Sequence, residues 1–447
     1  MGDYHHSSKG LCGYLFWSKV LLSLTLSLGG LGLLSYNIYD KHILSLAHTA
    51  TSAAASRPAW VFPIDGSDPS CWRQTVATTN TAAGRVEPPD STTLFGVSLD
   101  WATDSVPLIV NRMGGIYRPA VYNSFIQMNA TDFLVDMMNW QAQQIAVVGG
   151  IYQVTLQPTV PMSQIPDATL QAVARQMAFM NGVYGVPVIL RYGHEMNGYW
   201  YAYGQQPSSY VASFRKLAQY VHVATNMTAM IADLALLDTN QDGVFNVADD
   251  PYTPYWPGPE YVDWVGLSVY QYHQNSSNVN DYVNANVAVG PCFIQDYIQG
   301  TLNCRPRSAA AGNRAFYDNF AVTYNKPFAL PESGAQYAVN ATNVVPQSVD
   351  EATMKKAWIA SAFGLSPGAS NTPAFPLLKL IVNFEEAKVE LETNTLNQLR
   401  DYRITQDPAV MSAVTSVFQP AARMLWAGQL SYQCGGQVHI TKSLPSA

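Results

Sequence analysis

From Leu94 onward, short apolar runs alternate along the chain with longer amphipathic stretches. This alternation is typical of parallel strands joined by helices, because each helix returns the chain to the starting edge of the sheet. Helices are expected, for example, at residues 167–180 and 208–223, where apolar residues recur at spacings of three and four. The expected strands lie near residues 95–99, 119–126, 144–151, 186–191, 228–234, 262–270, 327–331 and 378–384. Eight such units predict an α/β fold that closes into a (β/α)8 TIM barrel, here placed at residues 93–447.

An apolar segment precedes this barrel. Residues 20–39 carry no charge and lie between Lys19 and Asp40, which is long enough for a helix to cross a bilayer. We expect a retained signal anchor, with residues 1–19 as a cytosolic tail and the rest exported as a type II membrane protein. A cleaved signal peptide, which would leave a secreted protein, is the alternative, because the strongest apolar part is shorter and contains three glycines. Residues 40–92 are rich in Ala, Ser and Thr and are predicted to be a linker, with a short packed stretch at 59–72.

Cysteines and glycosylation sequons agree with export. Four cysteines follow the apolar segment, and four cysteines allow three pairings. We prefer Cys292 with Cys304, which closes one loop, and Cys71 with Cys434, which ties the ends of the domain together. The Asn-x-Ser/Thr sequons begin at Asn129, Asn226, Asn275 and Asn340.

Composition limits the partners. The net charge is −7 and no basic block is present, which argues against a nucleic-acid partner. The chain has 26 Tyr, 16 Phe and 10 Trp. Aromatic rings suit sugars, which present flat C–H patches between hydroxyls, although a large core would use the same residues.

Two glutamates lie where predicted strands end. Glu195 follows the apolar run 186–190 within Arg-Tyr-Gly-His-Glu-Met-Asn-Gly-Tyr-Trp (191–200), and Glu332 lies in Lys-Pro-Phe-Ala-Leu-Pro-Glu-Ser-Gly (326–334). On the strand count above they end strands 4 and 7, at the rim where barrel enzymes hold their active sites. Two inward-reaching carboxylates there can approach to roughly 5–5.5 Å, the separation of retaining glycosidases. The pair predicts an enzyme that cleaves a polysaccharide.

Four segments resemble glycoside hydrolase family 26, whose members include β-mannanases and some β-glucan- and xylan-cleaving enzymes. They are His194–Trp200, residues 255–270, Pro331–Gly334 and Asp401–Arg403, in order along the chain. The resemblance implies that Glu195 is the general acid/base and Glu332 the nucleophile, with no cofactor needed.

The same resemblance implies roles for neighbouring residues. Tyr270 would donate its hydroxyl to Glu332, and Arg191 would keep Glu332 ionised. His194 would bind substrate or orient the carboxyls, and Trp200 would stack under a sugar ring. Members of the family often carry a tryptophan at the end of strand 8, where this chain has Phe384, so the choice of sugar is left open.

A separate loop matches a calcium-binding pattern. Residues 238–249 place oxygen ligands at the spacing of an EF-hand loop, with Gly243 at the turn. The expected ligands are Asp238, Asn240, Asp242, the Val244 carbonyl, Asn246 and Asp249. An Asp/Asn-rich solvated turn is the alternative.

The predicted function is therefore a retaining endo-β-glycosidase, with β-1,4-mannan as the leading substrate. Three alternatives stay open: a catalytically silent carbohydrate-binding or wall-associated protein, a β-glucan or xylan hydrolase, and a transglycosylase that uses the same two carboxylates.

Overall fold

The structure, a computed structural model, describes residues 64–65, 85–90, 92–246, 248–271, 274–275, 278–282, 286–301, 304, 314–339, 349–364, 375–390, 398–418, 423–433 and 438–440. The chain separates into two compact units, residues 1–59 and 60–447, and every described residue belongs to the second. The predicted anchor at 20–39 lies outside the described residues. Among those described, no helix is both long and apolar enough to cross a membrane.

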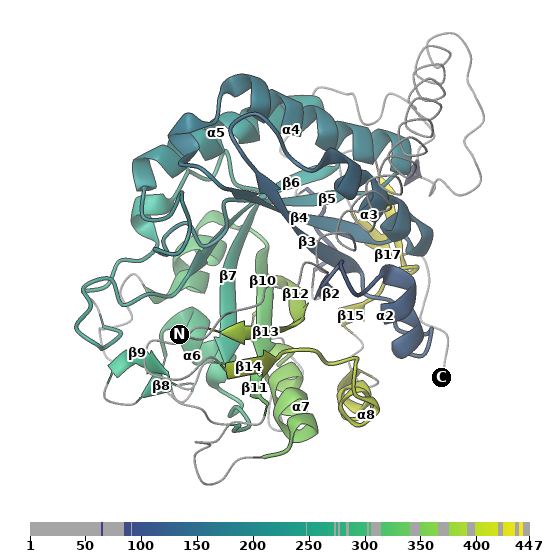
Figure 1. Ribbon diagram of the computed structural model, residues 1–447, viewed down its shortest axis with the longest axis vertical. Coiled ribbons are helices and arrows are strands. Elements are labelled where there is room, and N and C mark those ends of the chain that lie inside the picture. Colours follow the sequence, from purple (N-terminus) through teal and green to yellow (C-terminus); the bar gives the residue numbers. More distant parts are fainter. Residues whose placement is uncertain are drawn as a thin grey trace, which may run out of the picture. The chain divides into compact units, whose positions relative to one another are not determined.

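Eight parallel strands form a closed barrel (Figure 1). They are β2 (Thr93–Leu99), β3 (Val121–Met128), β4 (Ile151–Pro158), β5 (Val188–Tyr192), β6 (Thr228–Ala235), β7 (Trp264–Gln271), β10 (Phe328–Ala335) and β12 (Leu378–Glu385). Each pairs with its neighbour in sequence order, and β12 pairs in parallel with β2, which closes the ring. The predicted eight-stranded parallel barrel is confirmed.

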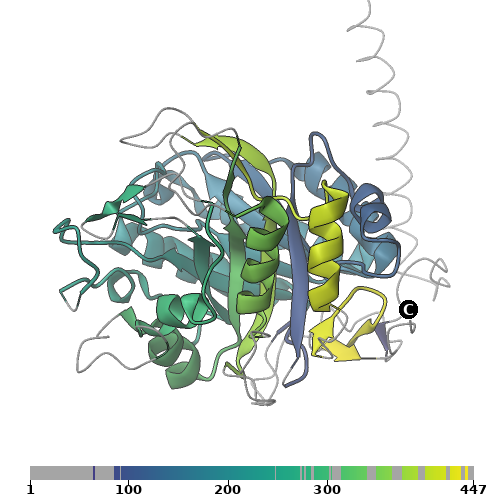
Figure 2. The same ribbon diagram turned by 90° about the horizontal axis from the view of Figure 1, so that it is seen from below.

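Helices surround the strands (Figures 1 and 2). They are α2 (Val106–Arg112), α3 (Val135–Val148), α4 (Asp167–Phe179), α5 (Pro207–Ala224), α6 (Phe293–Gln299), α7 (Glu351–Ala362) and α8 (Pro408–Phe418). Single turns of 3-10 helix occur at Met162–Gln164 and Thr253–Tyr255, and π-helical turns at Met180–Tyr184 and Tyr317–Val322. The helices predicted at 167–180 and 208–223 correspond to α4 and α5.

Two expectations about these units are wrong. The strand predicted at 144–151 is the end of α3: Ile145 and Ala146 are buried whereas Val147 is 79% exposed, which is a helical alternation. Gly149 then ends the helix at φ 74°, in the left-handed region that glycine favours, and β4 begins at Ile151. The connection from β6 to β7 also holds no α-helix in its described residues, because its Asp/Asn-rich run is followed by four prolines between 251 and 259.

Small sheets lie at both ends of the barrel (Figure 2). At the carboxyl ends of the barrel strands lies an antiparallel sheet of β11 (Tyr337–Ala338), β14 (Gln398–Asp401) and β13 (Ala387–Glu390), in which β11 follows β10 and β13 follows β12. β8 (Gln274–Asn275) and β9 (Asn278–Tyr282) form a hairpin after β7. At the other end, β15 (Met424–Leu425) pairs with the start of β2, and β16 (Leu430–Gln433) pairs with β17 (Val438–Ile440) and with β1 (Ile64–Asp65).

Residues 85–90, which were predicted as linker, also pack against the base of the barrel. Val86 is fully buried, and the Nε1 of Trp264 donates to the carbonyl of Arg85 at 2.8 Å. Lys379, at the start of β12, binds Glu87 and Asp90 at 2.6 and 2.7 Å. Residues 85–90 are therefore part of the folded unit.

One predicted disulfide is confirmed. Cys292 and Cys304 are bonded, with their Cα atoms 5.2 Å apart. Cys71 and Cys434 lie outside the described residues.

Of the sequon asparagines, Asn129 is exposed and Asn226 is only 8% exposed, which leaves little room for a glycan on Asn226.

Candidate active site

The inward-facing side chains of the barrel change from apolar at its base to polar at its mouth. The base layers contain Leu94, Val121, Ile151, Ile189, Ile231, Trp264, Ala329 and Leu380. Residues two apart in a strand face the same way, so the next inward positions follow by register. They include Ser98, Asn123, Gln153, Thr155, Arg191, Asp233 and Ser268, all buried. The polar end is the carboxyl end of the strands, where barrel enzymes place their chemistry.

Arg191 is the fully buried centre of this polar layer. Its Nε donates to Asp233 at 2.8 Å, its Nη1 to Glu332 at 2.6 Å, and its Nη2 to Ser268 at 2.9 Å. Burial raises the pKa of Asp233 to about 6, against the opposing charge of Arg191. One guanidinium thus holds two carboxylates from β6 and β10, the strands on either side of β7, and the planar fork of arginine is suited to that task.

Glu332 is turned into the barrel by an irregularity in its strand. The register of β10 shifts between Leu330 and Ser333 relative to β12, and β-bulges of this kind re-aim side chains beside active sites. One carboxylate oxygen accepts from Arg191, and the other accepts from the hydroxyl of Tyr270 at 2.7 Å. Glu332 is 7% exposed. The predicted contacts of Tyr270 and Arg191 with Glu332 are therefore present.

Glu195 lies just beyond β5 in an uncommon backbone conformation. Its φ is 48°, and its N–H donates to the carbonyl of Asp233 at 3.0 Å. The Nε1 of Trp200 donates to its carboxyl at 3.0 Å. Burial raises the pKa of Glu195 to about 8, and the negative charge of Glu332 adds to the rise. Glu195 therefore keeps its proton at neutral pH while Glu332 is surrounded by hydrogen-bond donors.

The hydrogen bonds of His194 run to two tyrosines. Its Nε2 lies 2.7 Å from the hydroxyl of Tyr201, and the hydroxyl of Tyr203 donates to its carbonyl at 2.9 Å. The two tyrosine rings stack at 5.1 Å. Burial lowers the pKa of His194 well below its usual value, and the nearby charges of Arg191 and Lys388 lower it further. A neutral imidazole here fixes the loop that carries Glu195.

The aromatic residues at the mouth differ in exposure. Trp200 is 44% exposed and Tyr199 is 75% exposed, so both can meet a ligand. Phe384 is only 3% exposed, because its ring packs edge-on against Tyr270 at 6.0 Å and Tyr402 at 5.3 Å. Phe384 therefore offers no open platform for a sugar, although it has the predicted place at the end of the eighth barrel strand.

Several site residues were missed by the sequence motifs. Asp233 is one, and its signal was available: it is the only acidic residue in the apolar run of β6, and buried acids are almost always paired. Tyr201 and Tyr203 carried no such signal. Glu386, just past β12, is partly buried, and burial together with the negative charge of Asp100 raises its pKa to about 7.

The predicted calcium loop is closed by its own hydrogen bonds. Gly243, at φ 86°, donates its N–H to Asp238 at 2.7 Å, and the N–H of Asn246 donates to Asp249 at 2.8 Å. The side-chain amides of Asn240 and Asn246 donate to Asp242 at 3.0 and 2.9 Å. The predicted ligands thus cluster, but their carboxylates face N–H groups. Among the residues described, no group of three or more His, Cys, Asp or Glu is arranged to hold a metal.

Comparison with known proteins gives three results. Residues 37–299 match the glycosyl hydrolase family 26. The chain is 31% identical over 106 residues to a mannan endo-1,4-beta-mannosidase of Bacillus subtilis (strain 168), covering 22% of this chain and 26% of that protein. It is 28% identical over 118 residues to the mannan endo-1,4-beta-mannosidase A and B of Caldalkalibacillus mannanilyticus, covering 24% of this chain and 21% of that protein. The chain thus matches about a quarter of the length of these curated relatives.

Solved structures of similar chains include a mannanase of Bacillus subtilis, with 17% identity and a TM-score of 0.45 over 83% of this chain and 96% of that one. A family 26 β-mannanase from Bacteroides ovatus has 14% identity and a TM-score of 0.46 over 76% of this chain and 91% of that one.

Proposed function

Because the chain belongs to glycosyl hydrolase family 26, we propose that it cleaves β-1,4-mannan internally, with retention of anomeric configuration. The observation that carries the proposal is the pairing of two carboxyls in different surroundings. Glu195, whose pKa is raised to about 8, holds a proton, and Glu332 accepts hydrogen bonds at both of its oxygens. Mannan is preferred to other β-glycans because both curated relatives are named as mannosidases acting on it.

The proposed reaction has two steps. Glu332 attacks the anomeric carbon while Glu195 gives its proton to the leaving oxygen, which forms a glycosyl-enzyme and releases the shorter chain. Glu195, now ionised, takes a proton from water, and that water breaks the bond to Glu332. Tyr270 and Arg191 hold the Glu332 carboxylate in line for attack. They stabilise its negative charge again when the bond between the sugar and Glu332 breaks.

The test is release of reducing ends by the purified protein from β-mannan, glucomannan, mixed-linkage β-glucan and xylan. The variants Glu195→Ala and Glu332→Ala serve as blanks. We expect release from mannan, loss of nearly all of it in both variants, and a β-configured first product by NMR. Release only from glucan or xylan would reassign the substrate. Longer products in place of new reducing ends would indicate transglycosylation, and binding without turnover in the unmodified protein would indicate a binding role.

We also propose that residues 238–249 bind Ca²⁺ through the six predicted ligands. The spacing of the ligands in the sequence and the turn at Gly243, whose N–H binds Asp238, support the proposal, while the amides on Asp242 would have to turn their oxygens to the ion. The test is thermal unfolding with calcium and with chelator. A rise in melting temperature with calcium that Asp242→Ala abolishes is expected, and an unchanged value would leave a hydrogen-bonded turn.

For localisation, we propose export with residues 20–39 as a membrane anchor. The uncharged length of that segment and the disulfide between Cys292 and Cys304 support it. N-terminal sequencing of the protein recovered from membranes tests it, since a start near residue 55 would mean a cleaved signal peptide.

A further inference from the structure

A hairpin at the mouth of the barrel brings a lysine to the site. β13 continues directly from β12, the strand that ends in Phe384 and Glu385, and pairs antiparallel with β14. In this register Ala387 lies opposite Asp401, and Lys388 lies opposite Arg400. Tyr337 of β11 also pairs with Asp401. The hairpin is therefore joined to the ends of both β10 and β12, the strands that carry Glu332 and Phe384.

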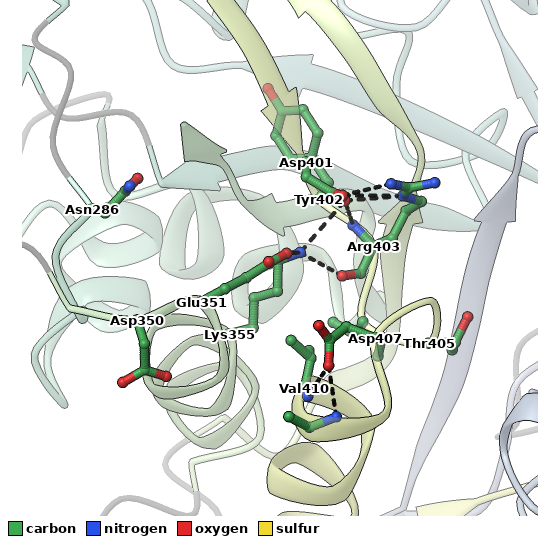
Figure 3. A network of polar contacts seen from close by, with 12 residues as sticks. Asn286, Asp350, Glu351, Lys355, Asp401, Tyr402, Arg403, Thr405, Asp407 and Val410 are labelled. Carbon is green, nitrogen blue, oxygen red and sulfur yellow. Dashed lines mark hydrogen bonds and ion pairs between the residues drawn. The ribbon is translucent and has the colours of Figure 1, made fainter. Parts of the chain in front are cut away.

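Polar contacts fix the root of this hairpin (Figure 3). Lys355 of α7 is 1% exposed and contacts Glu351, Asp401 and the carbonyl of Arg403. The guanidinium of Arg403 binds Asp401 at 2.6 Å. On the other strand, the buried carboxyl of Glu385 accepts from the N–H groups of residues 404 and 405. The position of Lys388 is thus set by anchored backbone on both strands.

The side chain of Lys388 lies over the ring of Phe384. Its Nζ is 5.0 Å from the ring centroid, within the range of a cation–π contact. Phe384 packs on Tyr270, whose hydroxyl binds Glu332, so the ammonium stands close to the nucleophile side of the site. Its charge also acts on Glu386 and on His194, which places it among the polar groups of the mouth. Lys388 itself is exposed, so a ligand can reach it.

The two sides of the cleavage point can be told apart. Glu195 gives its proton to the leaving sugar, and Trp200 binds Glu195, so Trp200 belongs to the leaving-group side. Glu332 attacks the other sugar, and the chain of contacts from Glu332 through Tyr270 and Phe384 leads to Lys388. The sugar attacked by Glu332 would therefore meet Lys388, since Phe384 is 3% exposed and has no free face for stacking.

We propose that Lys388 is a specificity-determining residue whose ammonium hydrogen-bonds the hydroxyls of the sugar that Glu332 attacks. Glu386 lies beside Lys388, so the site offers one carboxyl as an acceptor and one ammonium as a donor, whose charges offset each other. The ligand that suits this pair is a neutral hexose. A charged hydrogen bond replaces the aromatic stacking that an open ring would give. This inference rests on the proposed glycosidase function.

The test compares Lys388→Met, which keeps an apolar stem over Phe384, with Lys388→Arg, which keeps the charge. Lys216→Met is the matched control, because Lys216 is an exposed lysine on α5 that pairs with Asp167 away from the site. kcat and KM are measured on the best polymer of the panel and on its oligosaccharides. Calorimetry on Glu332→Gln, with and without Lys388→Met, measures oligosaccharide binding when nothing is cleaved.

We expect Lys388→Met to lower kcat/KM and oligosaccharide affinity by roughly 10- to 100-fold, the range of one hydrogen bond to a charged group. Lys388→Arg should recover part of the loss, and Lys216→Met should match the unmodified protein. All variants should keep the same melting temperature, since Lys388 is exposed. A change of less than twofold in both assays, with cleavage by the unmodified protein intact, would overturn the role of Lys388 alone. Absence of both cleavage and binding in the unmodified protein would overturn the proposed function and this inference together.

Discussion

Glu195 combines a special backbone conformation with a special charge state. A φ of 48° is uncommon for a residue with a side chain, and strain of this kind concentrates at functional sites. The conformation is held by the bond from its N–H to the carbonyl of Asp233 and by the bond from the N–H of Gly198 to its carbonyl. Holding the Glu195 carboxyl in this position therefore lowers the stability of the fold.

Replacing Glu195 should reveal that strain. Both Glu195→Gly and Glu195→Ala remove the carboxyl. Glycine adopts the left-handed conformation without strain, whereas alanine keeps the strain. We expect the glycine variant to unfold with a free energy higher than that of the alanine variant by about 1 kcal/mol. Urea unfolding of both inactive variants measures the difference. Equal stabilities would show that the backbone at Glu195 is unstrained.

The raised pKa of Glu195 predicts an alkaline limit to activity. The general acid works only when protonated, so kcat/KM should be retained below pH 8 and fall as pH rises through about 8. A pH–rate profile of the unmodified protein on a soluble substrate measures this limb. Loss of activity already near the ordinary carboxyl value of 4.5 would show that Glu195 is not the acid.

Sequence motifs identified the site residues that chemistry constrains, and missed those that packing constrains. Glu195, Glu332 and Tyr270 stood at predicted strand ends, where the barrel rim made their meeting foreseeable. Lys388 and Tyr201 became visible only through contacts with distant elements. The burial of Phe384 was equally hidden, because it depends on Tyr402, which follows β14.

At the scale of elements, the ends of helices and strands were harder to predict than their order. The run at residues 145–148 is apolar and short, so its pattern suits a strand, and only the burial of one side shows a helix. The loop between β6 and β7 shows the opposite limit, because its prolines exclude a helix that the repeating pattern had predicted. Seven of the eight barrel strands, all except β4, were foreseeable in order, since buried parallel strands leave strong apolar runs.

The anchor of the β13–β14 hairpin should be sensitive to Lys355. Lys355→Met leaves Asp401 and Glu351 without their shared cation and should cost roughly 2–3 kcal/mol, less than a fully buried pair because these carboxylates are partly exposed. It should also weaken sugar binding by loosening β14, the strand that pairs with β13 and so supports Lys388. Lys356→Met, at the next and exposed position of α7, is the control. Chemical unfolding and KM together test the prediction. An unchanged KM would show that the contacts of Lys355 do not influence sugar binding.

At the scale of the whole molecule, stability and chemistry occupy opposite ends of the barrel. The base is an apolar cluster in which Val86, Leu430, Tyr432 and Val438 cover the inward residues of the strands. The mouth holds buried carboxylates and the buried guanidinium of Arg191, which cost stability to assemble. The stability of the fold and the rate of the reaction should therefore respond to different substitutions.

Tyr432→Ala should demonstrate this separation. Tyr432 is 2% exposed, and its hydroxyl donates to the carbonyl of Gly149 at 3.0 Å. Loss of the ring should lower the free energy of unfolding by roughly 3–5 kcal/mol, as for other buried aromatics. kcat and KM measured well below the lowered melting temperature should match those of the unmodified protein. A comparable fall in kcat would mean that the base and the mouth are coupled.

The pairing of early and late segments at the base has a practical consequence. Residues 85–90 and strands β15 to β17 all pack around the amino-terminal ends of the barrel strands, so both ends of the folded unit emerge beneath the barrel. A partner fused at either end, or a bead that holds the protein by either end, would stand behind the enzyme. The mouth of the barrel would then remain free to travel along an insoluble polymer.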